Sequence, residues 1–343
     1  MGNHDKRLSL PRLMAQLSIE DIEDFAEIFG FETPQWNAKD GGKAKRWFAH
    51  QIVCHPEDVL NKLPLSDLVM MENIIDNDSG MRANTTHTTI YACVLGLIDF
   101  HTDGEYDYFD MPPELIKAFA PYVTNVVDDV RNKMRFIMEN LLLGLTNLYG
   151  RVTRGEYLKQ ISKHFDFDEG GNVREFYGWL RDNSVLIHFD DWGDDDSAKG
   201  DDDVVFYSPF MWDDVDAFER HVKKINREPF SKDEIIEAGK YPTPTIETPY
   251  NQDVERMLEK DFKLKGDEIS TVLFEIWWRL QHEDDPDFEE SNCKDYILHE
   301  LIPTASPERG GADVLLRMLQ TFMNYCNGIP RWTLRGRCPK EIG

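Results

Sequence analysis

Apolar residues recur at helical spacing through both ends of the chain. Before the run that ends at Phe29, Ser18 predicts an N-cap with an acid, Asp21, at the third helical position, and Gly30 is expected to stop the helix. The same periodicity predicts further helices at about 39–54, 66–75, 251–262, 267–281, 293–301 and 311–325. We therefore expect a helical N-terminal region at 1–80 and a helical C-terminal domain at 251–343.

The middle of the chain combines helices with short strands. The Asp103-Gly104 pair lies between two apolar stretches and predicts a β-hairpin, because Asp-Gly tolerates the positive φ angles of a tight turn. Further on, three helical segments are followed by two apolar strands, Val185–Phe189 and Val204–Tyr207, joined by an acidic loop. Helix, strand, acidic turn, strand and proline thus occur twice in the same order.

This repeated plan predicts a mainly α fold with small β-hairpins (α+β), built as tandem winged-helix-like units flanked by helical N- and C-terminal regions. The first hairpin unit is expected at 81–122, with its leading helix from about residue 65, and the second at 126–225. A proline-rich linker is expected at 226–250. One larger mixed domain is the alternative, since either arrangement places helices against the strand pairs.

The loop of the second unit carries eight aspartates and one lysine. A DNA-binding wing needs the opposite charge, because cations that neutralise phosphates supply much of the affinity for nucleic acid. We therefore interpret the loop as a surface for a basic protein partner, and a loop of solvated, mutually repelling carboxylates is the alternative. The candidate partner-binding residues are Asp190, Asp191, Asp194, Asp195, Asp196, Asp201, Asp202, Asp203 and Trp192.

The whole chain is acidic, with 64 Asp and Glu against 38 Lys and Arg and a formal net charge of −26. Such a charge repels nucleic acid and anionic membranes and favours basic partners, although it can also serve solubility alone. The five cysteines are scattered without a CxxC pair, which is typical of reduced thiols in a cytoplasmic protein. No apolar run approaches the ~20 residues of a membrane span, so we expect neither membrane insertion nor export.

Two basic segments support an alternative in which the chain binds nucleic acid. One lies on the predicted second helix beside Trp47 and Phe48, and the other is the C-terminal tail. A solvated helix face with both aromatic side chains in the core is the simpler interpretation of the first segment. The candidate residues are Lys39, Lys43, Lys45, Arg46, Arg331, Arg335 and Arg337.

Known catalytic and metal-binding patterns are missing from the sequence. It has no HExxH, GxSxG or P-loop motif, His50 and Cys54 lack a second pair of zinc ligands, and the acidic loops fail the EF-hand spacing. We predict no catalytic residue, cofactor or metal. The carboxylates of 284–290 are expected to form a solvated loop. Of the adjacent Trp277 and Trp278, one should enter the core, while the other packs partly against the next helix or serves as a surface anchor.

The C-terminal segment NGIPRWTLRGRCPKEI carries a family resemblance through Asn327, Pro330, Trp332, Leu334, Gly336, Pro339, Glu341 and Ile342. With these residues and the N-terminal helices, the chain resembles uncharacterised bacterial proteins that often end in a zinc-binding SEC-C motif. The Cys and His cluster of that motif does not follow Ile342, so the resemblance implies no zinc site here.

Three functions follow as hypotheses. The first is a non-enzymatic cytoplasmic protein that binds a basic protein surface, with a version in which it mimics nucleic acid, as some inhibitors from phages and mobile elements do. The second is a winged-helix regulator that binds nucleic acid through the two basic segments. The third is an enzyme with an unrecognised site, which a concave cluster of titratable groups would indicate.

Overall fold

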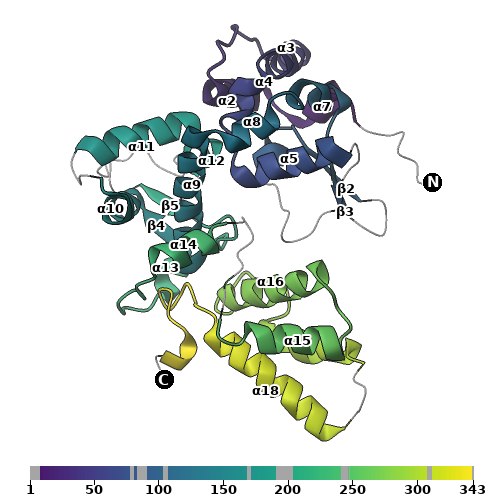
Figure 1. Ribbon diagram of the computed structural model, residues 1–343, viewed down its shortest axis with the longest axis vertical. Coiled ribbons are helices and arrows are strands. Elements are labelled where there is room, and N and C mark those ends of the chain that lie inside the picture. Colours follow the sequence, from purple (N-terminus) through teal and green to yellow (C-terminus); the bar gives the residue numbers. More distant parts are fainter. Residues whose placement is uncertain are drawn as a thin grey trace. The chain divides into compact units, whose positions relative to one another are not determined.

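The computed structural model describes residues 8–77, 81–82, 91–102, 107–167, 171–190, 204–240, 246, 248–306 and 311–341 (Figure 1). This described part is mostly helical and contains two small antiparallel sheets. The expectation of a mainly α fold with small β elements is therefore confirmed. In the same residues, no helix combines the length and the apolar character that a bilayer span requires.

The chain divides into two compact units. The first unit comprises Met1–Ala83, His87–Glu139 and Arg154–Val204, and the second comprises Asn84–Thr86, Asn140–Thr153 and Val205–Gly343. The helix α9 (Val130–Tyr149) contributes its first half to the first unit and its second half to the second unit.

Short helices make up most of the first unit. They are α1 (Leu10–Leu13), α2 (Ile19–Phe29), α3 (Gly41–Cys54), α4 (Pro56–Leu60), α5 (Leu65–Asn77), α6 (Tyr91–Val94), α7 (Pro113–Phe119), α8 (Val123–Asp128), α10 (Arg154–Phe165), α11 (Gly171–Asn183) and α12 (Val185–Asp190). The predicted N-cap of α2 is present and forms a capping box, because the Ser18 hydroxyl accepts from the Asp21 N–H at 3.0 Å and the Asp21 carboxylate accepts from the Ser18 N–H at 2.6 Å. Gly30 ends this helix with φ of 76°.

The predicted first hairpin is present as two antiparallel strands, β2 (Asp99–Thr102) and β3 (Asp107–Asp110). Phe100 lies opposite Phe109, and β1 (Met81–Arg82) pairs with the other edge of β3. The Asp103-Gly104 turn itself lies outside the described residues.

The second predicted hairpin is wrong in its first strand. Val185–Phe189 is helical, as part of α12, and β5 (Val205–Tyr207) pairs instead with β4 (Arg151–Thr153). Val185, Leu186 and Ile187 are all fully buried, and a short continuous apolar run does not distinguish a strand from a buried helix. Ser184 favours the helix, because its hydroxyl accepts from the Ile187 N–H at 3.3 Å.

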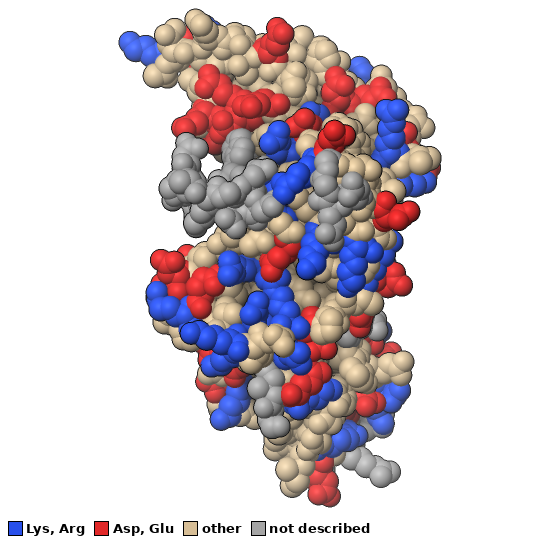
Figure 2. Space-filling model, turned by 90° about the vertical axis from the view of Figure 1, so that its left-hand side faces the viewer, with Lys and Arg blue, Asp and Glu red and all other residues tan. Residues whose placement is uncertain are grey.

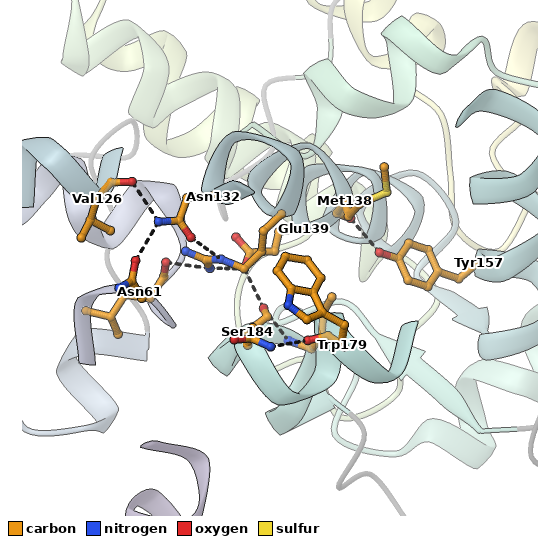
Figure 3. Close-up of polar contacts among 12 residues, drawn as sticks. Asn61, Val126, Asn132, Met138, Glu139, Tyr157, Trp179 and Ser184 are labelled. Carbon is orange, nitrogen blue, oxygen red and sulfur yellow. Dashed lines mark hydrogen bonds and ion pairs between the residues drawn. The ribbon is translucent and has the colours of Figure 1, made fainter. Parts of the chain in front are cut away.

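A buried ion pair and its hydrogen bonds link several segments in the interior of the first unit (Figure 3). Arg135 donates to the Glu139 carboxylate at 2.5 Å on the next turn of α9, and both side chains are shielded from water. The Ser184 hydroxyl donates to the same carboxylate oxygen at 2.6 Å, and Arg135 also donates to the Leu63 carbonyl at 2.9 Å. These bonds offset the cost of burying two charges and tie α9 to the turn before α12.

The second unit contains the β4–β5 pair and a larger helical core. Its helices are α13 (Val215–His221), α14 (Lys232–Ala238), α15 (Asn251–Asp261), α16 (Asp267–Gln281), α17 (Cys293–Asp295) and α18 (Ala312–Gly328), with a π-helical turn at Tyr296–Leu301. Helices α15, α16 and α18 pack against one another (Figure 1). Large aromatic residues, among them Trp212, Phe218, Trp277, Phe322 and Trp332, fill the core.

Candidate functional site

Most of the aspartate loop that the sequence singles out lies outside the described residues. This holds for Asp191, Trp192, Asp194, Asp195, Asp196, Asp201, Asp202 and Asp203. Asp190 is the last residue of α12, and only its backbone is described.

The basic cluster at 39–46 lies on and before α3, and contacts within the first unit occupy two of its four cations. Lys43 forms an ion pair with Asp40 at 2.6 Å, and the Lys45 ammonium donates to the Ala15 carbonyl at 2.5 Å. Lys39 and Arg46 are exposed. This arrangement fits a solvated helix face.

The arginines of the C-terminal segment form hydrogen bonds within the second unit. Arg331 is buried and donates to the Cys326 carbonyl at 3.3 Å. Arg335 donates to the Ile225 carbonyl at 3.1 Å, and Arg337 donates to the Asn226 carbonyl at 2.9 Å. The segment therefore packs as a loop, and Arg335 joins other cations at a cavity of the second unit.

The described structure brings together a different set of residues in a groove of the second unit. The groove has a volume of about 800 Å³ and lies between the segment after β5, the outer face of α16 and the acidic loop that follows it. Its apolar wall consists of Phe210, Met211, Phe274, Trp278 and Phe288, together with the ring of His282. We call this cavity the acidic groove.

Residues at helical spacing on α16 form part of the aromatic wall of the acidic groove. Phe274, Trp278 and His282 follow each other at intervals of four residues along and just beyond α16, which places them on one face. The neighbouring Trp277 is 2% exposed and lies in the core, where its ring contacts Trp332 at 5.5 Å and also packs behind Phe274 at 5.8 Å. Of the two adjacent tryptophans, Trp277 is thus the core residue and Trp278 the partly exposed one.

Phe288 extends this aromatic wall from within the acidic loop. Its ring meets Trp278 edge to face at 5.1 Å and stacks on His282 at 5.0 Å. The loop turns back on itself because the Asp285 N–H donates to the His282 carbonyl at 3.1 Å and the Asp287 N–H donates to the Asp285 carboxylate at 3.1 Å. A turn of this kind keeps Phe288 directed toward α16.

Six carboxylates surround the aromatic wall: Asp213, Glu275, Asp285, Asp287, Glu289 and Glu290. Arg279, which is buried behind the wall, pairs with Glu275 at 3.1 Å and with Glu290 at 2.6 Å. The other four form no ion pair within the described ranges of the chain. The groove therefore combines aromatic faces with uncompensated negative charge.

Burial shifts the pKa of two groups that line this groove. It raises the pKa of Glu275, against the opposing effect of Arg279. It also lowers the pKa of His282, so that the neutral imidazole is favoured in the folded protein. At neutral pH the His282 ring therefore adds aromatic surface to the groove without adding a positive charge.

The prediction of a solvated loop at 284–290 misses the wall that Phe288 forms. The signals are present in the sequence, as Phe274, Trp278 and His282 are four residues apart and Phe288 is the one aromatic residue in an acidic run. The sequence does not show that α16 and the acidic loop pack against each other. It also does not show that Phe210 and Asp213, which are distant along the chain, line the same groove.

Comparison with protein-family models, curated proteins and solved structures finds no match to this chain.

Proposed function

We propose that this protein is an interaction protein that binds a basic segment of a partner protein in the acidic groove. The observation that carries the proposal is the placement of the Trp278 and Phe288 rings beside carboxylates that lack a cation partner within the described residues. A Lys or Arg side chain over an aromatic face gains about 0.5–2 kcal/mol, and carboxylates add charge-assisted hydrogen bonds.

The size of the groove favours an extended segment over a single ion. A volume of about 800 Å³ accommodates several side chains. The aromatic wall would cover the aliphatic stem of a lysine or arginine, while Asp213, Asp287 and Glu289, all exposed, would meet its charged end.

The net charge of the whole chain also favours a basic partner. With a net charge of −26, the protein attracts basic partners over longer distances and repels nucleic acid and anionic surfaces. The aspartates of 190–203 remain a proposed second contact for the same partner. The five free cysteines are in keeping with a cytoplasmic location, which we also propose.

We further propose a winged-helix-like arrangement for 126–225. Its support is the order helix (α9), strand (β4), three helices (α10, α11 and α12) and strand (β5) along the chain, together with the antiparallel pairing of β4 with β5. In this proposal α12 replaces the strand that would precede the wing. Winged helices also serve as protein-binding scaffolds, so the arrangement is compatible with a protein partner and does not by itself define one.

Calorimetric titration with a lysine-rich decapeptide tests the proposed function. The variant Asp213→Asn/Asp287→Asn/Glu289→Gln removes three exposed groove carboxylates, and Asp233→Asn/Glu259→Gln/Asp313→Asn removes the same charge elsewhere in the second unit. At ~0.5 kcal/mol for each exposed charge pair, the groove variant should bind about tenfold more weakly than the control variant. Equal affinities of the two variants would contradict the proposal, and so would equal binding of a glutamine-substituted peptide.

A further inference from the structure

A second cavity in the second unit has the opposite charge. Its volume is about 250 Å³, and its polar lining consists of Arg151, Lys223, Lys224, Arg227, Arg335 and Glu219. Glu219 is the one carboxylate among these lining residues, and it pairs with Arg151 at 2.6 Å. The other four cations that line the cavity are Lys223, Lys224, Arg227 and Arg335. We call this cavity the cationic pocket. In a chain of net charge −26, such a concentration of cations is unexpected.

Backbone hydrogen bonds hold the two cation-bearing segments of the pocket together. The Lys223 N–H donates to the Thr333 carbonyl at 2.7 Å, and the Glu228 N–H donates to the Arg335 carbonyl at 3.1 Å. Arg335 adds a side-chain bond to the Ile225 carbonyl at 3.1 Å and adopts a φ of 56°, in the left-handed region that non-glycine residues rarely occupy. The segment after α13 and the C-terminal segment are thus fixed side by side.

Arg227 is positioned before any ligand binds. Its guanidinium lies 4.8 Å from the centre of the Tyr149 ring and donates to the Arg151 carbonyl at 3.4 Å. Phe218 and Trp332, each 1% exposed, close the base of the pocket, and the Trp332 indole N–H donates to the Asn147 carbonyl at 2.7 Å. A ligand would therefore meet ordered cations over a rigid aromatic base.

Lys223 and Lys224 are the free charges of the pocket. Both are exposed, and neither forms an ion pair within the described part of the second unit. Figure 2 views the side on which α13 and the C-terminal segment lie in Figure 1, and Lys and Arg side chains gather on it. The pocket therefore offers uncompensated ammonium groups beside fixed guanidinium groups.

We propose that the cationic pocket binds the phosphate group of a small phosphate monoester. Guanidinium and ammonium donors suit a phosphate dianion, and a volume of about 250 Å³ accommodates a phosphate with a small organic group. A polyanion such as RNA would extend beyond the pocket over a chain whose net charge is −26, which opposes its binding. A small ligand inside the pocket interacts mainly with the local cations, because salt screens more distant charges over about 8 Å at physiological ionic strength.

Calorimetric titration of the full chain with ribose 5-phosphate, in a buffer free of phosphate, tests this inference. The variant Lys223→Gln/Lys224→Gln removes the two free ammonium groups, and Lys260→Gln/Lys294→Gln removes two exposed lysines elsewhere in the same unit. We expect binding by the wild type and the control variant, and binding at least tenfold weaker by the pocket variant. Equal weakening in both variants would overturn the proposal.

Three further titrations define the ligand class. Ribose without the phosphate should give no binding, while inorganic phosphate should compete with ribose 5-phosphate for the pocket. Binding of a twelve-residue single-stranded oligonucleotide without binding of ribose 5-phosphate would overturn the proposal in favour of nucleic acid. Absence of binding by all of these probes would overturn it as well.

Discussion

The Trp278 and Phe288 rings meet edge to face, with their centroids 5.1 Å apart. Trp278 lies on α16 and Phe288 in the loop that follows it, so this contact joins a rigid helix to an acidic loop. It brings aromatic faces and carboxylates to the same cavity, which is the combination that favours a cationic side chain.

Substitution of Trp278 by alanine should weaken binding of a lysine-rich peptide by about tenfold, because it removes both the aromatic face and the support for Phe288. Trp179→Ala provides the control, since Trp179 is 36% exposed but belongs to the first unit. Fluorescence anisotropy of a labelled peptide measures both affinities. If the two variants bound the peptide equally well, Trp278 would not belong to the binding surface.

The stability of the protein should depend on the protonation of His282. Burial lowers its pKa from 6.5, so folding favours the neutral imidazole. Because the folded pKa lies below the unfolded pKa, the stabilising contribution is present above the unfolded value and is lost as the pH falls through the folded value.

Urea unfolding at about pH 7.5 and about pH 5 measures this contribution, since histidine changes charge in that window. The free energy of unfolding of His282→Phe, which keeps a ring against Phe288, should fall less over this interval than that of the wild type. The control variant His299→Phe, at an exposed histidine, should follow the wild type. Parallel losses in the wild type and His282→Phe would show that His282 is not the group responsible.

The close approach of α9 and α14 requires glycine at position 144. A Cβ atom there would lie 1.7 Å from the Ile235 carbonyl oxygen, so the two helices must move apart in Gly144→Ala. We expect a loss of about 3 kcal/mol in the free energy of unfolding. Gly178→Ala is the matched control in α11, because nothing lies within 4 Å of the new methyl group.

Gly178→Ala should stabilise the protein by about 0.5–1 kcal/mol, since alanine has less backbone freedom to lose than glycine in a helix. Thermal and urea unfolding of both variants give the comparison. A destabilised Gly178→Ala together with an unaffected Gly144→Ala would contradict the described packing of these helices.

The Arg135–Glu139 pair should be costly to break and less costly to remove. Glu139→Gln leaves the fully buried guanidinium without its counter-charge, and we expect a loss of about 3–5 kcal/mol. The double variant Arg135→Met/Glu139→Gln removes both charges and should lose less stability than the sum of the losses in Arg135→Met and Glu139→Gln. Chemical denaturation of the four proteins measures the coupling, and additive losses would contradict the ion pair.

Local signals in the sequence predict much of the fold but only fragments of the sites. The capping box before α2 and the Asp-Gly hairpin depend on neighbouring residues, and both elements are present. The prediction of a strand at Val185–Phe189 is wrong. A fully buried segment is apolar throughout, so it lacks the alternation of apolar and polar residues that distinguishes a half-buried strand from a helix.

The groove and the pocket depend on contacts between distant segments. Asp213 reaches the acidic groove from a segment far from Phe288, and Arg335 joins Arg151 and Lys223 at the cationic pocket. The sequence shows that Trp277 and Trp278 face different directions, but only packing selects Trp277 for the core. Composition predicts that a partner is basic without giving the place where it binds.

The most direct test of the proposed function is to locate a bound basic peptide. Carbodiimide coupling joins peptide amines to carboxylates in contact with them, and mass spectrometry identifies the linked residues. We predict links to the acidic groove, at Asp213, Asp285, Asp287, Glu289 and Glu290. Links confined to the aspartates of 190–203, or spread evenly over exposed carboxylates, would contradict the assignment of the groove as the binding site.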